Sequence, residues 1–266
     1  MEIINKYIPR EYLALKINYC RQRLSDLPGV KMYKCNEDGV RRDRVIYENH
    51  RYSTNSERGR ELYRIWELRE DLECKLDIYE SIWRDHFRGS PPEHITPCKV
   101  ERYLTVGYQQ RVLLNKEFFD SLKNDDNTKY LKHGNYYFDG IYYRSAAEKE
   151  IAMYYTEQGI PFKYEPSITL FGLSKPINTD FVIYIEELDT CIFHEHFGIK
   201  NSIDYARISK IKYGNYIEAG LIPEEDILFT FDTNDVMFDI RMLEANLNGV
   251  VYCKMLSGQN QYGITA

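Results

Sequence analysis

The sequence predicts a mixed fold of helices and strands, an α/β chain of the α+β type. A mainly helical N-terminal region with a small β-hairpin is expected to precede a half in which strands and helices follow one another. Two observations predict this. Apolar residues recur every three or four positions over residues 54–87, which is typical of a long helix. From residue 136 onward, short β-prone runs alternate with helical stretches, which predicts both strands and helices in this half.

The N-terminal region begins with a predicted helix over residues 9–25, which the sequence Asp-Leu-Pro-Gly at 26–29 should end. Residues 30–35 and 44–47 predict the two strands of a hairpin around the turn Asp38-Gly39. Basic side chains of this hairpin could contact phosphates of nucleic acid, although a solvated hairpin would show the same pattern. These are Arg41, Arg42, Arg44 and Arg51.

The long helix over 54–87 is expected to begin at a cap on Ser53 or Thr54. Its interleaved Glu and Arg residues predict a surface helix laced with ion pairs. Such a helix could be half of an antiparallel helical hairpin or the seam of a homodimer. Pro and Gly at 89–92 end it, and a shorter helical segment is expected around 113–123.

The chain of 266 residues is long enough for two domains, and the polar stretch 124–127 is expected to be the linker. We therefore predict an N-terminal region over 1–130, a second domain over 131–256 and a flexible tail over 257–266. Six scattered cysteines form no C-x-x-C pair, which argues against a zinc ribbon or a disulfide-rich secreted scaffold and indicates a cytoplasmic location. No run approaches the length of a membrane span, so no membrane partner is expected.

The net charge of −6 is unevenly distributed along the chain. Residues 1–135 carry 25 basic and 22 acidic side chains, whereas the remainder carries 10 and 19. An acidic second half suits a cation site, and the more basic first half could supply contacts to phosphates. A solvated surface of mixed charge would give the same counts.

The second half predicts a regular order of elements. They are a strand-turn-strand over 136–143, a helix from Ser145 to about Gly159, short strands within 161–170, a strand over 177–185, a turn at 186–189, a strand over 191–197, a helix over about 205–220, a strand over 227–233 and a last helix over 235–248.

Three carboxylates of this half are placed so that they can converge. Asp180 and Glu195 each lie in an apolar, β-prone run, and the turn at 186–189 joins the two runs. They can therefore lie side by side on adjacent antiparallel strands, while the helix beginning at Ser145 presents Glu148. Because hard cations such as Mg²⁺ are held by oxygen ligands, the three carboxylates predict a divalent-cation site.

Each carboxylate also has a purely structural interpretation. Glu148 stands three residues after Ser145, the spacing of a capping box, in which the Glu carboxylate accepts a hydrogen bond from the N–H of the cap. Asp180 could cap the end of a strand. Glu195 could pair with a distant Lys or Arg, because a buried unpaired carboxylate is costly.

His194 and His196 flank Glu195 in alternation. On a strand both imidazoles would face away from the carboxylate, which argues against a His-Glu-His zinc site. His196 could still approach a phosphate if the strand ends or bulges at that residue.

The order of these elements resembles the core of the PD-(D/E)XK, or restriction-endonuclease-like, nuclease superfamily. A helix with Glu148, an apolar strand near Asp180, a hairpin and a strand with Glu195 follow one another as in that family. The string FHEHFG at 193–198 resembles one branch, in which a Glu-His-x-Gly element replaces the usual Glu-x-Lys. The likeness covers roughly residues 136–250 and rests on the order and spacing of several motifs.

The resemblance implies a metal-dependent nuclease acting on nucleic acid and favouring DNA. It also implies a restriction-endonuclease-like core, with a central mixed sheet flanked by helices. Glu148, Asp180 and Glu195, with the main-chain carbonyl of His196, would hold one or two Mg²⁺ ions, for which Mn²⁺ can substitute. Thr179 departs from the pattern, because the family usually has Pro before this Asp. Such nucleases commonly belong to phages, mobile elements, repair or defence systems.

The sequence also departs from the pattern at the catalytic amine. Phe197 stands two residues after Glu195, where Lys is usual, and that Lys orients water or stabilises charge on the reacting phosphate. Lys212 on the following helix is expected to supply the amine, with Lys210 as the second choice and His196 as a further assisting group. Glu165, in a Tyr-Glu element of the same branch, is a weaker candidate.

Two further classes of function fit the sequence. The absent Glu-x-Lys amine is compatible with a catalytically inactive nuclease-fold module that serves nucleic-acid binding or assembly. The long helix over 54–87 is compatible with a structural interaction protein, whose oligomers would survive removal of residues 136–266.

Overall fold

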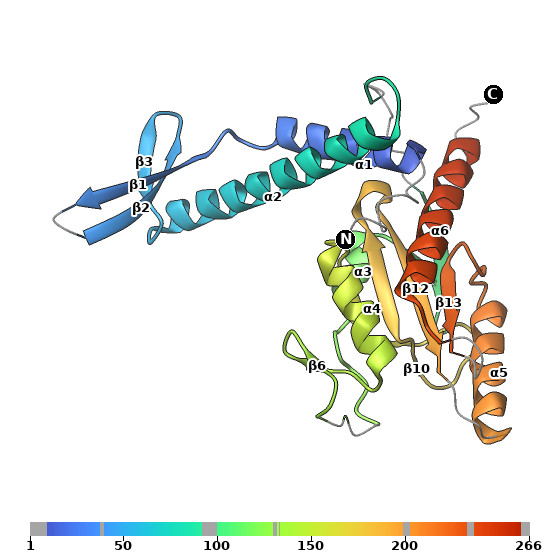
Figure 1. Cartoon of the computed structure of the whole chain (residues 1–266). Coiled ribbons are helices and arrows are strands. Elements are labelled where there is room, and N and C mark those ends of the chain that lie inside the picture. The colour runs from blue at the N-terminus through green and yellow to red at the C-terminus, as the bar shows by residue number, and fades with distance from the viewer. Residues whose placement is uncertain are drawn as a thin grey trace. The chain divides into compact units, whose positions relative to one another are not determined.

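The structure is a computed structural model that describes residues 10–37, 40–91, 100–129, 132, 134–198, 203–232 and 237–261. The described residues form six α-helices and several sheets, one of them a mixed four-stranded sheet, so the predicted α+β class is confirmed (Figure 1). The chain divides into two compact units, residues 10–97 and residues 98–266. None of the described helices is both long and apolar enough to cross a bilayer.

The N-terminal unit is a pair of helices with a three-stranded antiparallel sheet. Its elements are α1 (Arg10–Asp26), β1 (Lys31–Glu37), β2 (Val40–Tyr47), β3 (His50–Ser53) and α2 (Glu57–His86). The predicted hairpin is present, but β3 was not predicted. Glu48 and Asn49 both have positive φ, which gives the two-residue turn that joins β2 to β3. Ser56 caps α2 by accepting the Gly59 N–H at 3.1 Å, slightly later than expected.

Helices α1 and α2 run antiparallel within this unit. The Arg10 guanidinium lies 5.3 Å from the centre of the Trp83 ring, near the end of α2. Toward the other end, Arg69 Nη1 donates to the carbonyls of Leu24 and Leu27, at 2.9 and 3.1 Å. Of the two interpretations of the long helix, the helical hairpin is therefore observed, and the homodimer stays a prediction.

The C-terminal unit surrounds the mixed four-stranded sheet. Its elements are β4 (Tyr103–Val106), β5 (Gln110–Leu113), α3 (Lys116–Ser121), β6 (Tyr137–Phe138), β7 (Ile141–Tyr142), α4 (Ala146–Glu157), β8 (Phe162–Tyr164), β9 (Ser167–Ile168), β10 (Ile177–Asn178), β11 (Phe181–Ile185), a 3₁₀ turn (Glu186–Leu188), β12 (Thr190–Phe197), α5 (Ile203–Glu218), β13 (Ile227–Phe231) and α6 (Ile240–Gln261).

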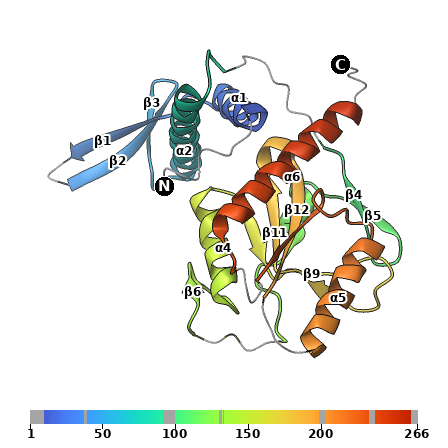
Figure 2. The ribbon, with the colours of Figure 1, turned by 45° about the vertical axis from the view of Figure 1, so that its right-hand side comes forward.

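The four-stranded sheet has the strand order β13-β12-β11-β8, in which β12 and β13 are parallel and the other neighbours antiparallel. Figures 1 and 2 show it between α4 on one side and α5 on the other. Tyr155 of α4 contacts His194, whereas Tyr216 of α5 contacts Glu195. Because side chains alternate along a strand, these two contacts mark the two faces of β12.

The boundary between the units lies earlier than the predicted position near residue 130. The elements β4, β5 and α3 precede residue 130 but share their core with the four-stranded sheet. Leu104, Leu114 and Phe118 pack in the same buried cluster as Val182 and Phe193. The short apolar runs of this segment are therefore part of the second unit.

The last helix also differs from its prediction. Instead of covering 235–248 and leaving a loose tail, α6 continues to Gln261. Val250, Val251 and Met255 are buried, which explains why the helix extends past the predicted end. Residues 262–266 of the predicted tail lie outside the described residues.

A buried ion-pair network fixes α6 to the rest of its unit. Asp226 and Lys254 are both fully buried, and Lys254 Nζ donates to Asp226 Oδ1 at 3.1 Å. Arg102 Nε and Nη2 donate to Asp226 Oδ2 at 2.8 and 2.6 Å. Burial tends to raise the pKa of Asp226, but the hydrogen bonds of Arg102 and the charge of Lys254 outweigh it and lower the pKa.

Asp226→Asn should lower the free energy of unfolding by about 3–5 kcal/mol, because it leaves the buried Lys254 ammonium without a counter-charge. Urea unfolding followed by circular dichroism measures this change. Asp120→Asn is the matched control, since Asp120 forms only an exposed ion pair with Lys116 and should change stability by less than about 0.5 kcal/mol. Equal unfolding midpoints for the two variants would show that the buried Asp226–Lys254 ion pair does not stabilise the fold.

Glu244 of α6 gives a pH-dependent prediction. Its side chain is only 3% exposed, and burial raises the pKa of its carboxyl to about 7. The folded state then holds a proton that the unfolded state releases near pH 4.5, so stability should fall as pH rises from about 4.5 to about 7. Glu244→Gln should remove this loss and stabilise the protein at pH 8 by about 1–3 kcal/mol.

Urea unfolding at pH 5 and pH 8 tests this expectation. Glu157→Gln is the control, because Glu157 is an exposed residue near the end of α4. A Glu244→Gln variant with the same pH dependence as the wild type would show that Glu244 is not held protonated.

Candidate functional site

The strands bring Asp180 and Glu195 side by side. Pairing of β11 with β12 sets Phe181 opposite His194, so Asp180 and Glu195 are the next opposed pair. The Asp180 N–H donates to Glu195 Oε2 at 3.3 Å, and each residue is only 2% exposed. The convergence predicted from the hairpin spacing is therefore observed.

Glu148 joins them from the first turn of α4. Ser145 caps this helix, as predicted, because its Oγ accepts the Glu148 N–H at 3.1 Å. The Glu148 carboxylate does not return to the N–H of the cap, however. It accepts hydrogen bonds from the Arg144 N–H at 3.1 Å and from the Tyr164 hydroxyl at 2.6 Å. Only half of the capping box forms, and the carboxylate turns toward the sheet.

Each of the three carboxylates has one oxygen that is anchored by an uncharged donor. Such donors fix the orientation of a carboxylate without neutralising its charge. The anchoring bonds are Tyr164 Oη to Glu148 Oε2 at 2.6 Å, His196 N–H to Asp180 Oδ2 at 2.8 Å and Tyr216 Oη to Glu195 Oε2 at 2.7 Å.

The other oxygen of each carboxylate, here called the outward oxygen, faces a cationic side chain. Arg144 Nη2 lies 2.9 Å from Asp180 Oδ1 and 3.7 Å from Glu148 Oε1. Lys212 Nζ pairs with Glu195 Oε1 and lies 3.9 Å from Asp180 Oδ1. The three outward oxygens thus surround positive charge supplied by one guanidinium and one ammonium.

A fourth carboxylate, Glu165, belongs to the same network and is only 1% exposed. Arg144 Nε lies 2.9 Å from Glu165 Oε1, and Asn127 Nδ2 donates to the same oxygen at 2.9 Å. Lys132 Nζ lies 3.2 Å from Glu165 Oε2. Glu165, which the sequence offered only as a weaker candidate, is therefore held by Arg144, the side chain that also contacts Asp180.

Burial and mutual repulsion disfavour the ionised forms of two carboxylates in this cluster, Glu195 and Glu148. Burial and the charge of Asp180 raise the pKa of Glu195 to about 7, against the opposing effects of Lys212 and Tyr216. Burial and Asp180 also raise the pKa of Glu148, although Arg144 opposes them. Carboxylates that share a site of low dielectric repel one another, which disfavours their ionised forms.

Both histidines lie on the opposite face of β12, as the alternation predicted. His194 Nδ1 is hydrogen bonded to the Tyr155 hydroxyl at 2.7 Å, and His194 Nε2 to Thr230 Oγ1 at 2.8 Å. His196 Nδ1 is hydrogen bonded to the same Thr230 hydroxyl at 2.9 Å. Burial lowers the pKa of His194 to about 3, so this imidazole is neutral. No His-Glu-His site forms around Glu195.

The position of His196 corrects one prediction. Its imidazole was expected to assist at the phosphate, but it points away from the carboxylates because the strand continues without a bulge to Phe197. The backbone N–H of His196 does reach the site, where it donates to Asp180 Oδ2. The main-chain carbonyl of His196 stays a predicted metal ligand.

Helix α5 delivers Lys212 to the cluster. Lys212 and Tyr216 are four residues apart, so both lie on one face of the helix and both contact Glu195. Lys210 is exposed and has no contact with the described carboxylates. The structure therefore places Lys212 in the site and Lys210 outside it.

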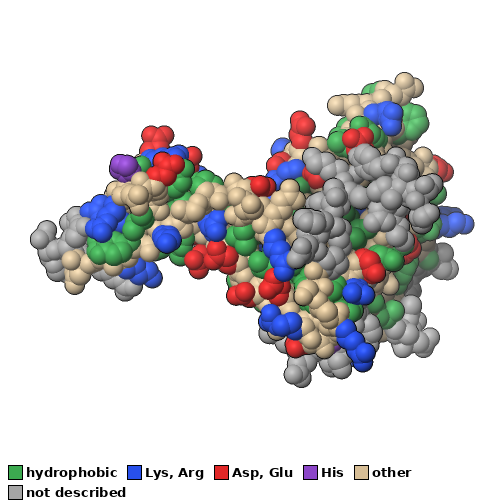
Figure 3. Space-filling model, turned by 90° about the horizontal axis from the view of Figure 1, so that it is seen from above, with side chains coloured by type: hydrophobic (Ala, Val, Ile, Leu, Met, Phe, Trp, Pro, Cys, Tyr) green, Lys and Arg blue, Asp and Glu red, His purple; other side chains and the backbone are tan. Residues whose placement is uncertain are grey.

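The predicted basic cluster belongs to the N-terminal unit. Arg44 lies in β2 and Arg51 in β3, with the Arg51 guanidinium 4.7 Å from the centre of the Tyr33 ring. The side chains of Arg41 and Arg42 lie outside the described part of the chain. Figure 3 shows acidic side chains interspersed with Lys and Arg along this unit, so its charge is mixed.

Several residues of the network were missed by sequence reasoning. They are Arg144, Tyr164, Tyr216, Asn127 and Lys132. Spacing could have indicated two of them. Arg144 stands four residues before Glu148, and Tyr216 stands four residues after Lys212, which places each pair on one side of a helix or of its first turn.

The donor set suits a hard cation, since the outward atoms are all carboxylate oxygens. As they stand, the described residues contain no group of three or more His, Cys, Asp and Glu side chains in metal-binding geometry. Arg144 and Lys212 lie between the carboxylates, and a metal ion would have to displace them. No family model matches the chain, and no curated protein or solved structure matches it.

Proposed function

We propose that the chain is a metal-dependent nuclease that hydrolyses phosphodiester bonds of nucleic acid, with DNA as the favoured substrate. The observation that carries the proposal is the set of three outward oxygens on Glu148, Asp180 and Glu195, which face positive charge. The other oxygen of each carboxylate is fixed by an uncharged donor. The order α4, β8, β11, β12, α5 and β13 further supports a restriction-endonuclease-like core.

Mg²⁺ held by the outward oxygens and the His196 carbonyl would lower the pKa of a water molecule and neutralise charge on the scissile phosphate. Tyr164, Tyr216 and the His196 N–H keep the carboxylates in place through their anchored oxygens. In hydrolysis, the water oxygen bonds to phosphorus, the bond to the leaving sugar oxygen breaks, and that oxygen takes up a proton.

Lys212 supplies the amine that the sequence lacks beside Glu195. Its Nζ lies at Glu195 Oε1 and 3.9 Å from Asp180 Oδ1 in the metal-free site, so an ion that displaces it from these oxygens would leave the ammonium next to a phosphate held by that ion. A cation at this place stabilises the negative charge that develops on the phosphate oxygens. The charge of Glu195 and Asp180 raises the pKa of Lys212 more than burial lowers it, so the amine stays protonated.

The proposal is tested with end-labelled single- and double-stranded DNA and RNA, incubated with Mg²⁺, Mn²⁺ or EDTA. We expect cleavage of at least one DNA substrate with either metal and none with EDTA. Cleavage that persists in EDTA, or no cleavage of any substrate by folded protein, would contradict a metal-dependent nuclease.

A second candidate is the catalytically inactive module for nucleic-acid binding or assembly. Arg144 and Lys212 already offset much of the negative charge of the carboxylates, and a cluster neutralised in this way can be stable without a metal. This candidate predicts binding of an oligonucleotide with the same affinity in Mg²⁺ and EDTA, and no cleavage in either.

The N-terminal unit would position the nucleic acid or build a homodimer in this proposal. Arg44 and Arg51, with Arg41 and Arg42 on the same hairpin, are the candidate contacts to phosphates. Substitution of such a residue should weaken binding of all sequences alike and reduce the salt dependence of the affinity.

A further inference from the structure

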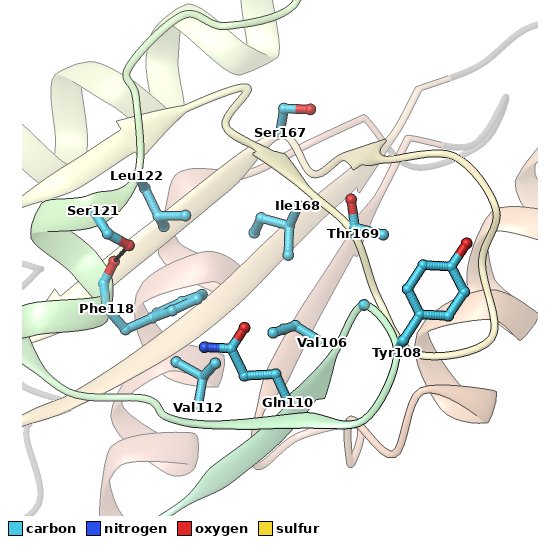
Figure 4. A pocket seen from close by; sticks show the side chains of 11 residues that line it. Val106, Tyr108, Gln110, Val112, Phe118, Ser121, Leu122, Ser167, Ile168 and Thr169 are labelled. Atoms are coloured by element: carbon cyan, nitrogen blue, oxygen red, sulfur yellow. Dashed lines mark hydrogen bonds between the residues drawn. The ribbon is translucent and has the colours of Figure 1, made fainter.

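Three hollows in the described residues differ sharply in charge. The hollow drawn in Figure 4 holds about 710 Å³ and is lined by uncharged side chains, among them Phe118 and Ile168. A hollow of about 750 Å³ in the N-terminal unit has basic and acidic side chains together. The third, here called the lysine groove, holds about 420 Å³, and its described lining has three lysines and no Asp or Glu. The lysines are Lys129, Lys175 and Lys212.

The lysine groove and the candidate site share one residue, Lys212. This residue lines the groove, and its Nζ pairs with Glu195. Ile177, which also lines the groove, stands three residues before Asp180. A strand whose phosphate is held by a metal at the outward oxygens would therefore lie next to the groove at Lys212.

The charge of the groove suits a polyanion. Lys129 and Lys175 are exposed, and neither pairs with an acidic side chain within the described residues. Lys212, the third lysine, pairs with Glu195, so Lys129 and Lys175 supply the positive charge of the groove that has no acidic partner among the described residues. Uncompensated lysines along one channel are the arrangement that tracks a phosphate backbone.

The wall of the groove is apolar as well as basic. Ile208 and Ile211 are 61% and 57% exposed, and both line it from one side of α5. Duplexes bury the faces of their bases in the stack, whereas single strands leave those faces open to apolar side chains. The volume of about 420 Å³ falls within the usual range of sites for small organic groups.

We propose that the lysine groove binds a single-stranded segment of nucleic acid adjacent to the scissile phosphate. Lys129 and Lys175 contact its phosphates, and Ile208 and Ile211 contact its sugars and bases. The inference rests on the proposed function, because it places the scissile phosphate at the outward oxygens. It goes further by naming an unpaired strand as the substrate.

The charge contribution is tested by fluorescence anisotropy of the full chain with a labelled 12-nucleotide single strand, in EDTA so that no metal-dependent cleavage occurs. Lys129→Glu and Lys175→Glu should each weaken binding about three- to tenfold. Together they should flatten the slope of log Kd against log salt by about 1.4, as expected for two contacts to a single strand. Lys123→Glu is the control, since Lys123 is exposed and does not line the groove.

The apolar contribution is tested with Ile208→Asn combined with Ile211→Asn. This variant should bind the single strand at least about fivefold more weakly, with an unchanged salt slope. Its affinity for a 12-base-pair duplex should stay within about twofold of the wild type. Equal losses for single strand and duplex would overturn the assignment of an unpaired strand.

Different results would contradict the groove assignment and the proposed nuclease function. If the lysine variants bind like Lys123→Glu while the wild type still cleaves with Mg²⁺, the groove assignment is wrong and the proposed function stands. If they weaken binding of the single strand and the wild type does not cleave, the groove is supported as a binding site and the nuclease proposal falls.

Discussion

Asp180→Asn is expected to lower the rate of metal-dependent cleavage on the order of 10³-fold or more. Asp180 Oδ1 is the outward oxygen that faces both Arg144 and Lys212, so it is central among the three. Asparagine has nearly the same shape but no charge. Its amide also cannot give Arg144 and the His196 N–H two carboxylate oxygens at once.

Single-turnover cleavage of a labelled oligonucleotide measures this loss. Asp120→Asn makes the same chemical change at an exposed residue of the same unit and should keep full activity. Circular dichroism and the unfolding midpoint must show that Asp180→Asn is folded. A folded Asp180→Asn protein with more than about a tenth of the wild-type rate would remove Asp180 from the proposed metal site.

Arg144→Ala is expected to have a large effect of another kind. The Arg144 guanidinium contacts Glu148, Glu165 and Asp180, which are all buried. Removing it leaves these carboxylates without their principal cation, so the metal-free protein should lose about 3–5 kcal/mol of stability. Burial tends to lower the pKa of Arg144, but the charges of the three carboxylates outweigh burial and raise the pKa above its usual value. The shift reflects the attraction between the guanidinium and these carboxylates.

Divalent cations should reverse this loss. If Arg144 Nη2 lies where a metal ion would bind, its removal takes away a competitor, and Mg²⁺ should raise the unfolding midpoint of Arg144→Ala more than that of the wild type. Thermal unfolding with and without Mg²⁺ measures both effects. Arg144→Lys should restore part of the stability, and Arg207→Ala, at an exposed position of α5, should behave as the wild type. If Mg²⁺ raised the unfolding midpoints of Arg144→Ala and the wild type equally, Arg144 would not compete with the metal ion for the carboxylates.

Much of the site could be predicted because it follows from local patterns. The hairpin spacing and the alternation along β12 determine that Asp180 meets Glu195 and that His194 faces away. The Ser145 cap fixes where α4 begins, and so where Glu148 points. Each of these conclusions needs only neighbouring residues and one strand pairing.

The remainder depends on contacts between distant segments. The predicted linker 124–127 is instead a support of the site, since Asn124 Oδ1 accepts the Tyr164 N–H at 2.7 Å and Asn127 donates to Glu165. Its polar composition suits buried hydrogen bonding as well as solvent, and sequence alone does not separate the two. The long α6 was missed for a similar reason, because Lys254 looks like a surface residue until its pairing with Asp226 is seen.

Binding of Mn²⁺ to the free protein tests the central claim most directly. Electron paramagnetic resonance counts the bound ions, and we expect one or two per chain on the wild type. Glu148→Gln, Asp180→Asn and Glu195→Gln should each weaken binding at least about tenfold, while Asp120→Asn should bind as the wild type. If the three variants kept the wild-type affinity, the outward oxygens would not be the metal ligands, and the proposed nuclease site would be wrong.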